Sequence, residues 1–126
     1  MGYLFIFVGA GLGGILRYAL STAISAAVNG TAFPFGTFEV NMVGCLTIGY
    51  LAKLSETQTI LQDDGRLFIF VGLLGGFTTF SSYGLETYQL IRDGEIVSAI
   101  ANAVGQVIVG IILVWLGFLA AKAMHG

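Results

Sequence analysis

The chain has 126 residues, of which 56% are hydrophobic and only 10% are charged. A soluble domain usually carries about 25% charged residues, so this composition predicts an integral membrane protein. The net charge of −2 and the single cysteine, Cys45, exclude a basic surface for nucleic acid and an intramolecular disulfide. One domain over residues 1–126 is expected, because no linker or low-complexity tract divides the chain.

Four apolar segments are long enough to cross a membrane, which takes about 20 residues of helix. The first is interrupted by Arg17, the second contains Glu39 and Asn41, and the fourth contains no charged residue. A polar loop at 55–66 follows the second segment, and a tight turn at 92–95 precedes the fourth. We therefore predict an all-α integral membrane protein with both termini on one side and four transmembrane helices over about residues 3–28, 36–54, 67–91 and 96–121.

The third segment is unusual for a helix that faces lipid. Adjacent Gly75 and Gly76 weaken the helix, and four hydroxyl residues follow within 78–82. Backbone that leaves helical geometry inside a bilayer is tolerated only where it is buried in protein, lines a cavity or binds an ion. We therefore predict a break in the third helix, with a functional centre around which the other helices pack.

The small size of the bundle predicts an oligomer, because four helices leave no room for a polar pathway once their side chains are packed. Many glycines also allow close approach between helices, which favours a tight dimer. Lys53, Arg66 and Lys122 are expected on the side of the termini and Arg92 on the other. Since this charge bias is small, we expect an antiparallel, dual-topology homodimer. The alternative is a single orientation set by three charges against one.

Polar side chains inside a span are costly and are the first candidates for function. The amide of Asn41 offers N–H donors to an anion or a carbonyl to a cation; alternatively, it forms an interhelical hydrogen bond. Ser98, Asn102 and Gln106 follow at four-residue spacing and so form a polar stripe on one helix face. A stripe of three favours a cavity or pathway, whereas a single polar residue would simply join two helices.

Charged and aromatic residues near the predicted break leave alternatives open. Arg17 either draws anions toward a vestibule or extends its head group to the membrane interface. Glu39 and Glu86 lie one to two turns from the ends of their spans, as mouth residues or as buried hydrogen-bond acceptors. Phe80 and Tyr83 share a helix face, either as core packing or as ring edges that face a small anion.

No pattern in the sequence points to an enzyme. The chain has no metal-ligand spacing, no nucleophile paired with a base and no phosphate-binding loop. The remaining classes are a channel, a transporter and a structural membrane subunit.

Three segments resemble the motifs of one known family. Gly9–Tyr18 is similar to its glycine-rich first-helix motif, and Gly36–Gly44 to its second-helix motif around an asparagine. Gly72–Tyr83 resembles its third-helix signature. The motifs lie in order in three of the four predicted helices, and the chain length also matches. By this resemblance the chain is identified as a member of the Fluc, or CrcB-type, bacterial fluoride channels.

The resemblance implies an antiparallel homodimer with two pores that exports fluoride passively across the bacterial inner (plasma) membrane. It also implies a vestibule position for Arg17, and a sodium ion held at the dimer interface by the backbone carbonyls of Gly75 and Thr78. The implied partners are the fluoride ion, a second copy of the chain and membrane lipid. The residues implied to line or flank the pores are Asn41, Phe80, Thr37, Ser81, Glu86, Asn102 and Gln106.

Position 83 departs from the family pattern, which has phenylalanine where this chain has Tyr83. The extra hydroxyl has three possible interpretations: a tolerated variant, an engineered substitution or a new fluoride ligand.

Two rival functions remain beside the resemblance. A small multidrug-type, proton-coupled exporter needs a carboxylate deep in the first helix, where Arg17 is the only charge. A non-transporting scaffold subunit needs neither the broken helix nor the polar stripe.

Overall fold

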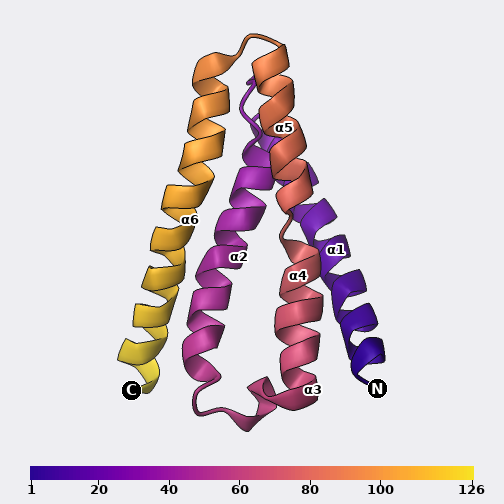
Figure 1. Ribbon diagram of the computed structural model, residues 1–126, viewed down its shortest axis with the longest axis vertical. Coiled ribbons are helices and arrows are strands. Elements are labelled where there is room, and N and C mark those ends of the chain that lie inside the picture. The colour runs from indigo at the N-terminus through magenta and orange to yellow at the C-terminus, as the bar shows by residue number, and fades with distance from the viewer.

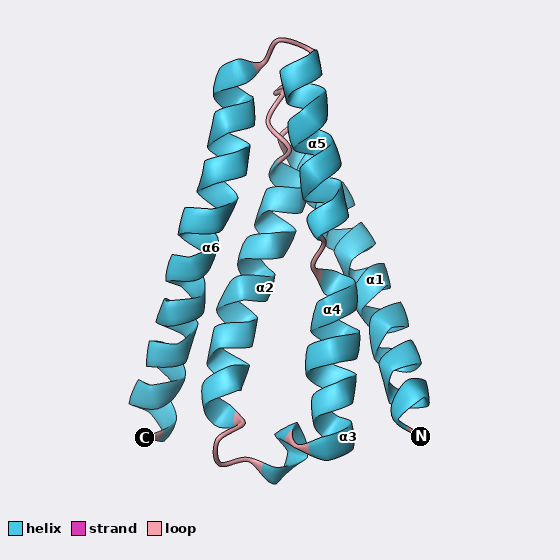
Figure 2. Cartoon of the chain, viewed as in Figure 1, coloured by secondary structure: helices cyan, strands magenta, loops and turns pink.

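Four long helical segments make up the fold, and the computed structural model, which describes residues 1–126, contains no strand (Figures 1 and 2). The first, second and fourth are single helices, α1 (Gly2–Ala27), α2 (Phe35–Leu54) and α6 (Ile96–His125). The third is assembled from shorter elements: α3 (Asp63–Arg66), the π-helical η2 (Leu67–Leu74), α4 (Gly75–Phe77) and α5 (Phe80–Arg92).

The helix boundaries differ from the expected ones in two places. The stretch between α2 and η2, predicted as an exposed loop, contains α3 and the short η1 (Thr59–Leu61), and Leu61 is only 4% exposed. Helix α6 continues past the predicted end at residue 121 to His125. The Tyr50 hydroxyl lies 2.8 Å from His125 Nε2, so a contact with α2 holds this last turn in place.

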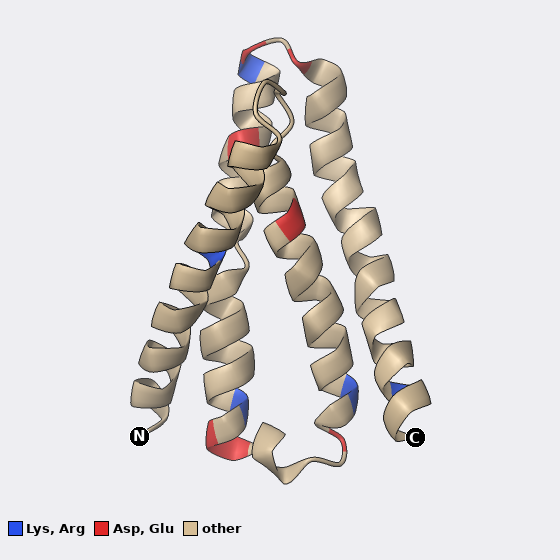
Figure 3. Cartoon of the chain, turned by 180° about the vertical axis from the view of Figure 1, so that it is seen from behind, with Lys and Arg blue, Asp and Glu red and all other residues tan.

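Length and hydropathy identify three stretches able to cross a membrane: Gly2–Ala27, Asp63–Arg92 and Ile96–His125. The fourth segment, α2, is shorter and packs along α6. Charged residues gather mainly near the two ends of the molecule (Figure 3). Only 17 of the 126 residues are buried, so most apolar side chains face outward, as lipid or another protein surface requires. The chain is therefore a membrane protein.

Glycines lie where the helices pack most closely: α1 packs against η2 and α4, and α2 packs against α6. A Cβ atom on Gly13 would meet the Leu73 carbonyl oxygen, and one on Gly49 would meet the Val114 carbonyl oxygen. Small residues at these points let the helix backbones approach closely. The helices converge toward the turn between α5 and α6 and spread toward the opposite end, where both termini lie (Figure 1).

The third segment changes direction at Thr78 and Thr79, whose backbones are extended, with ψ angles of 158° and 127°. The sequence had placed this change at Gly75 and Gly76, but both belong to α4, and Gly75 has helical angles of φ −61° and ψ −38°. Thr79 caps the next helix, because its Oγ1 accepts a hydrogen bond from the Ser82 N–H at 3.2 Å. The hydroxyl residues, not the glycines, therefore separate α4 from α5.

Candidate functional site

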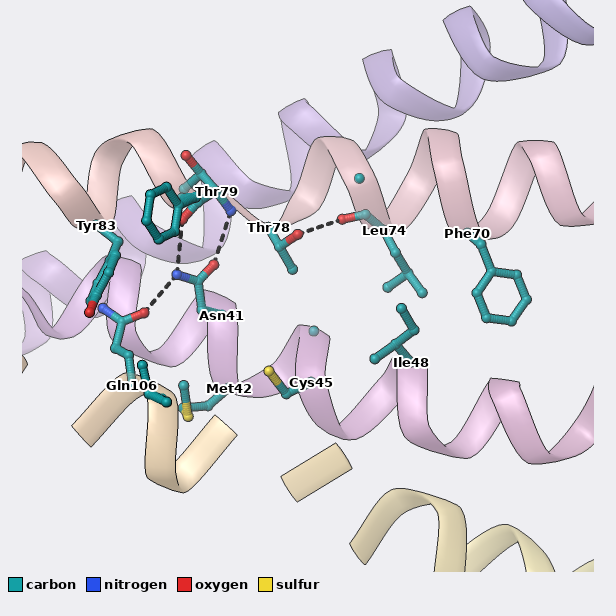
Figure 4. A pocket seen from close by; sticks show the side chains of 14 residues that line it. Asn41, Met42, Cys45, Ile48, Phe70, Leu74, Thr78, Thr79, Tyr83 and Gln106 are labelled. Atoms are coloured by element: carbon teal, nitrogen blue, oxygen red, sulfur yellow. Dashed lines mark hydrogen bonds between the residues drawn. The ribbon is translucent and has the colours of Figure 1, made fainter. Parts of the chain in front are cut away.

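The side-chain amide of Asn41, on α2, is paired with the backbone of Thr79 (Figure 4). Its Oδ1 accepts a hydrogen bond from the Thr79 N–H at 3.0 Å, and its Nδ2 donates to the Thr79 carbonyl at 3.1 Å. Both backbone groups would be costly to leave unsatisfied in a membrane interior. Asn41 thus makes the interhelical hydrogen bond that was one of its predicted alternatives.

A chain of hydrogen bonds continues from Asn41 into α6 and α5. Asn41 Nδ2 also donates to Gln106 Oε1 at 2.8 Å, and Gln106 Nε2 donates to Asn102 Oδ1 at 2.9 Å. Asn102 Nδ2 then donates to Thr87 Oγ1 at 2.8 Å, and the Thr87 hydroxyl donates to the Tyr83 carbonyl at 2.8 Å. Asn102 is fully buried and Gln106 is 8% exposed, so their side of α6 faces the interior of the chain.

The residues joined by these hydrogen bonds differ from the predicted polar stripe at two positions. Ser98 is half-buried and does not join the hydrogen bonds. Thr87 does join, and the sequence analysis missed it; the available signal was a hydroxyl residue one helical turn after Tyr83. Ser81, predicted near a pore end, is exposed, with its hydroxyl 3.3 Å from Thr79 Oγ1.

A cavity of about 420 Å³ lies between α2 and the third segment, with Asn41 and Gln106 at one end of it (Figure 4). No charged residue lines this cavity. Its walls are largely apolar, and they include Met42, Cys45, Ile48, Phe70, Leu74 and Val107. An ion in this space would meet uncharged amide and hydroxyl groups rather than a fixed charge.

Phe80 and Tyr83 line the same cavity with their rings close together, with centroids 5.4 Å apart and planes inclined by 50°. Phe80 is 80% exposed, so it is not core packing within this chain. The Tyr83 hydroxyl donates a hydrogen bond to the Ala103 carbonyl on α6 at 2.6 Å. Its hydrogen is therefore engaged within the chain and is not free to bind a ligand.

A second cavity, of about 190 Å³, brings Arg17, Thr37 and Glu86 together from α1, α2 and α5. Arg17 Nε donates to the Gly76 carbonyl at 3.0 Å, and Thr37 Oγ1 donates to Glu86 Oε1 at 2.6 Å. Glu86 is thus a hydrogen-bond acceptor that is half-buried. Glu39 differs from it, since it is exposed on α2, which excludes the role of a buried acceptor.

The carbonyl groups of Gly75 and Thr78 lack the partners that a continuous helix would give them. The Thr79 N–H, which would reach the Gly75 carbonyl, donates to Asn41 instead. No group of the chain donates to the Thr78 carbonyl. Gly75 and Thr78 both line the 420 Å³ cavity. No cluster of three or more His, Cys, Asp and Glu side chains that could hold a metal ion is present.

Comparison with known proteins matches residues 4–118 to the family described as CrcB-like protein, Camphor Resistance (CrcB). A relative from Methylobacillus flagellatus named fluoride-specific ion channel FluC is 43% identical, over 91% of this chain and 90% of the relative. A relative of the same name from Opitutus terrae is 43% identical over 98% of this chain and 94% of the relative. Another, from Chloroflexus aurantiacus, is 45% identical over 89% and 88% of the two chains.

Proposed function

The chain belongs to the family of CrcB-like proteins, and from this membership we propose that it is a fluoride-selective ion channel. The observation that carries the proposal is the shared name of its relatives, fluoride-specific ion channel FluC, at 43% identity over 91% and 98% of the chain. On this proposal the protein conducts fluoride passively out of the cytoplasm and is not an enzyme.

The chemistry of the two cavities supports an anion path. The larger cavity offers amide groups and aromatic rings without a charged residue, and the smaller one contains the guanidinium of Arg17. An uncharged path lets a small anion exchange water for close donors and still leave, because no opposite charge retains it. Ser81 and Thr37 supply hydroxyl groups near the ends of the path, and Glu86 lies beside Thr37.

The rival functions receive less support. A proton-coupled multidrug exporter needs a carboxylate deep in its first helix, and α1 contains neither Asp nor Glu. A scaffold subunit has no use for a buried row of amides, which is costly in a membrane protein unless it serves a function. Neither alternative agrees with the name that the relatives share.

We further propose that the active form is an antiparallel homodimer with two pores, in the bacterial inner membrane and surrounded by lipid. The larger cavity supports a partner copy, because Phe80 lines it and is nevertheless 80% exposed within one chain. The small charge bias supports dual topology, because Arg92 lies at one end of the molecule and Lys53, Arg66 and Lys122 lie at the other.

A sodium ion at the dimer interface completes the proposal. The residues present fit such an ion, because the carbonyl of Thr78 accepts no hydrogen bond and that of Gly75 has lost its helical donor to Asn41. Carbonyl oxygens are suitable ligands for a small hard cation. The same two carbonyls from each of two copies would hold the ion and supply fixed positive charge between two anion paths.

Efflux from liposomes tests the proposed function. Purified protein is reconstituted, the vesicles are loaded with potassium fluoride or potassium chloride, and external anion is followed by electrode after valinomycin is added. We expect rapid fluoride release and no chloride release above that of protein-free vesicles. Comparable chloride release would contradict selectivity, and release of a cationic drug only under a proton gradient would indicate the exporter. No release of any solute would favour the scaffold.

A further inference from the structure

Two successive residues of the third segment are extended, and α2 contacts each of them in a different way. The backbone of Thr79 is hydrogen-bonded to Asn41. The side chain of Thr78 rests against Gly44, because a Cβ atom on Gly44 would overlap Thr78 Cγ2. Asn41 and Gly44 are three positions apart, so they share one face of α2. This face therefore holds the extended residues at two adjacent points.

The contact at Gly44 involves the methyl group of Thr78 and little else. The next atoms that a Cβ there would meet, Phe77 Cδ2 and Thr78 Cβ, lie at 3.7 Å, which is an ordinary van der Waals distance. At Gly13 and Gly49, by contrast, a Cβ would meet a backbone carbonyl. Gly44 is buried, so the methyl group fills the space that a side chain at position 44 would occupy.

The hydroxyl group of Thr78 is fixed together with its methyl group. Thr78 Oγ1 donates to the Leu74 carbonyl at 3.0 Å, and the Thr78 N–H donates to the same carbonyl at 3.0 Å (Figure 4). The methyl and hydroxyl groups are both attached to Cβ. A rotation that moves the methyl group away from α2 therefore also withdraws the hydroxyl from Leu74. Threonine has few χ1 rotamers, and this pair of contacts selects one of them.

These contacts also determine where the Thr78 carbonyl points. This carbonyl and the Thr79 N–H belong to one peptide group, which is planar and trans. Because the N–H is bound to Asn41 Oδ1 at 3.0 Å, the carbonyl points away from Asn41. No group of the chain donates to the carbonyl, so it is held only through the atoms on either side of it. Asn41 fixes one side, and the side chain of Thr78 fixes the other.

We propose that Gly44 is a positioning residue for the sodium site, because it accommodates the methyl group of Thr78 and so holds the Thr78 carbonyl where the ion binds. This inference rests on the proposed function, which includes the ion at the dimer interface. Gly44 contributes no ligand and acts only through Thr78. Its role thus differs from the general helix packing expected for the glycines of this chain.

A pair of substitutions tests the assignment by filling this space and then restoring it. Gly44→Ala adds a methyl group that overlaps Thr78 Cγ2, and Thr78→Ser deletes Cγ2 but keeps the carbonyl and the hydroxyl. Protein purified in N-methylglucamine chloride is equilibrated with increasing sodium chloride at constant ionic strength. The melting temperature of the dimer in detergent micelles is followed by circular dichroism. A bound ion stabilises the folded dimer, so the sodium concentration that gives half of the stabilisation reports affinity.

We expect Gly44→Ala to raise this sodium concentration by about tenfold, since the displaced Thr78 side chain loses its rotamer and its hydrogen bond to Leu74. The double variant with Thr78→Ser should return to within about twofold of the unaltered protein. An unchanged sodium concentration in Gly44→Ala overturns the proposal, and so does a double variant that keeps the raised value. If Gly44→Ala alone does not fold, a double variant that recovers folding and sodium affinity supports the proposal, and one that does not overturns it.

Gly110→Ala is the matched control, because a Cβ there would lie 3.2 Å from Cys45 Sγ and does not reach Thr78. It should lower the melting temperature without changing the sodium concentration of half stabilisation. An equal change in this control overturns a specific role for Gly44. The measurement contains no fluoride, so it separates this inference from conduction. An unaltered protein that does not respond to sodium contradicts the sodium site and the positioning role, whereas absence of fluoride efflux contradicts the channel function.

Discussion

Arg17 on α1 donates a hydrogen bond from Nε to the carbonyl oxygen of Gly76 on α4, at 3.0 Å and across 59 positions of sequence. This carbonyl lies in the last turn before the chain becomes extended. Carbonyls at such an end lack helical donors and carry partial negative charge, which a guanidinium offsets. Arg17 is therefore directed into the protein, where it joins α1 to the end of α4, and it does not extend to the membrane interface.

Replacing Arg17 with glutamine should destabilise the protein by about 1.5–3 kcal/mol, the usual contribution of a hydrogen bond to a charged group. The loss follows because the Gly76 carbonyl is left without its charged donor. Denaturant unfolding in mixed micelles, followed by circular dichroism, measures the change. Arg92→Gln is the control, since its side chain is 58% exposed and pairs only with Asp93. Equal losses in the two variants would contradict a specific role for Arg17.

Phe80→Ile should lower fluoride flux by about tenfold or more, equivalent to about 1.4 kcal/mol, and leave the dimer intact. The substitution removes the ring edge, which is the positive part of an aromatic side chain, and keeps an apolar residue at the cavity. Liposome efflux and size-exclusion chromatography measure flux and assembly. Phe7→Ile, at a ring that is 77% exposed on α1, should conduct normally. Normal flux in Phe80→Ile with lowered stability would mean that the ring only packs.

Tyr83→Phe should raise fluoride flux and lower stability by about 1 kcal/mol. The variant loses the 2.6 Å hydrogen bond to the Ala103 carbonyl, and a neutral hydrogen bond contributes about that much. Without this bond the ring is free to adjust against Phe80, which lies 5.4 Å away between centroids. Efflux and denaturant unfolding should therefore change in opposite directions. A fall in flux would show instead that the hydroxyl assists permeation.

Removal of sodium should reduce both flux and dimer stability. Protein equilibrated for a long time in lithium or N-methylglucamine salts is compared with protein in sodium, because the proposed ion is buried and exchanges slowly. Restoring sodium should restore flux. Thr78→Ser is the control, since it keeps the carbonyl that we propose as ligand and a hydroxyl that can donate to Leu74. An unchanged dimer with unchanged flux in all three media would exclude the site.

Dual topology predicts that one reporter is reached from both faces of the membrane. Thr57→Cys places a thiol in the exposed turn after α2, and Cys45→Ala removes the native thiol. An impermeant maleimide should label part of the protein in intact cells, and the remainder only after the membrane is permeabilised. Labelling from a single face would reject the antiparallel arrangement. Fluoride efflux from the doubly substituted protein confirms that it is still active.

Composition and motif order by themselves determined that the chain is a helical membrane protein of this family. A helix must be long and apolar to cross a lipid bilayer, so both ends of α1 and the start of α6 were predictable to within one residue, whereas the last turn of α6 was not. The Gly72–Tyr83 signature likewise located the residues around which the site is built. The polar side chains Asn41, Asn102 and Gln106 were recognisable as candidates because such residues are rare within a span.

Only the tertiary structure decided what these groups bind. An amide with two donors and one acceptor suits an ion or a backbone equally well, and the choice for Asn41 depended on Thr79 lying opposite it. The position of the extended residues was also a tertiary outcome. Gly76 stays helical where α1 presses closely upon it, since a Cβ there would meet the Ala10 carbonyl. The chain leaves helical geometry two residues later, where Asn41 can satisfy the backbone groups that a helix no longer pairs.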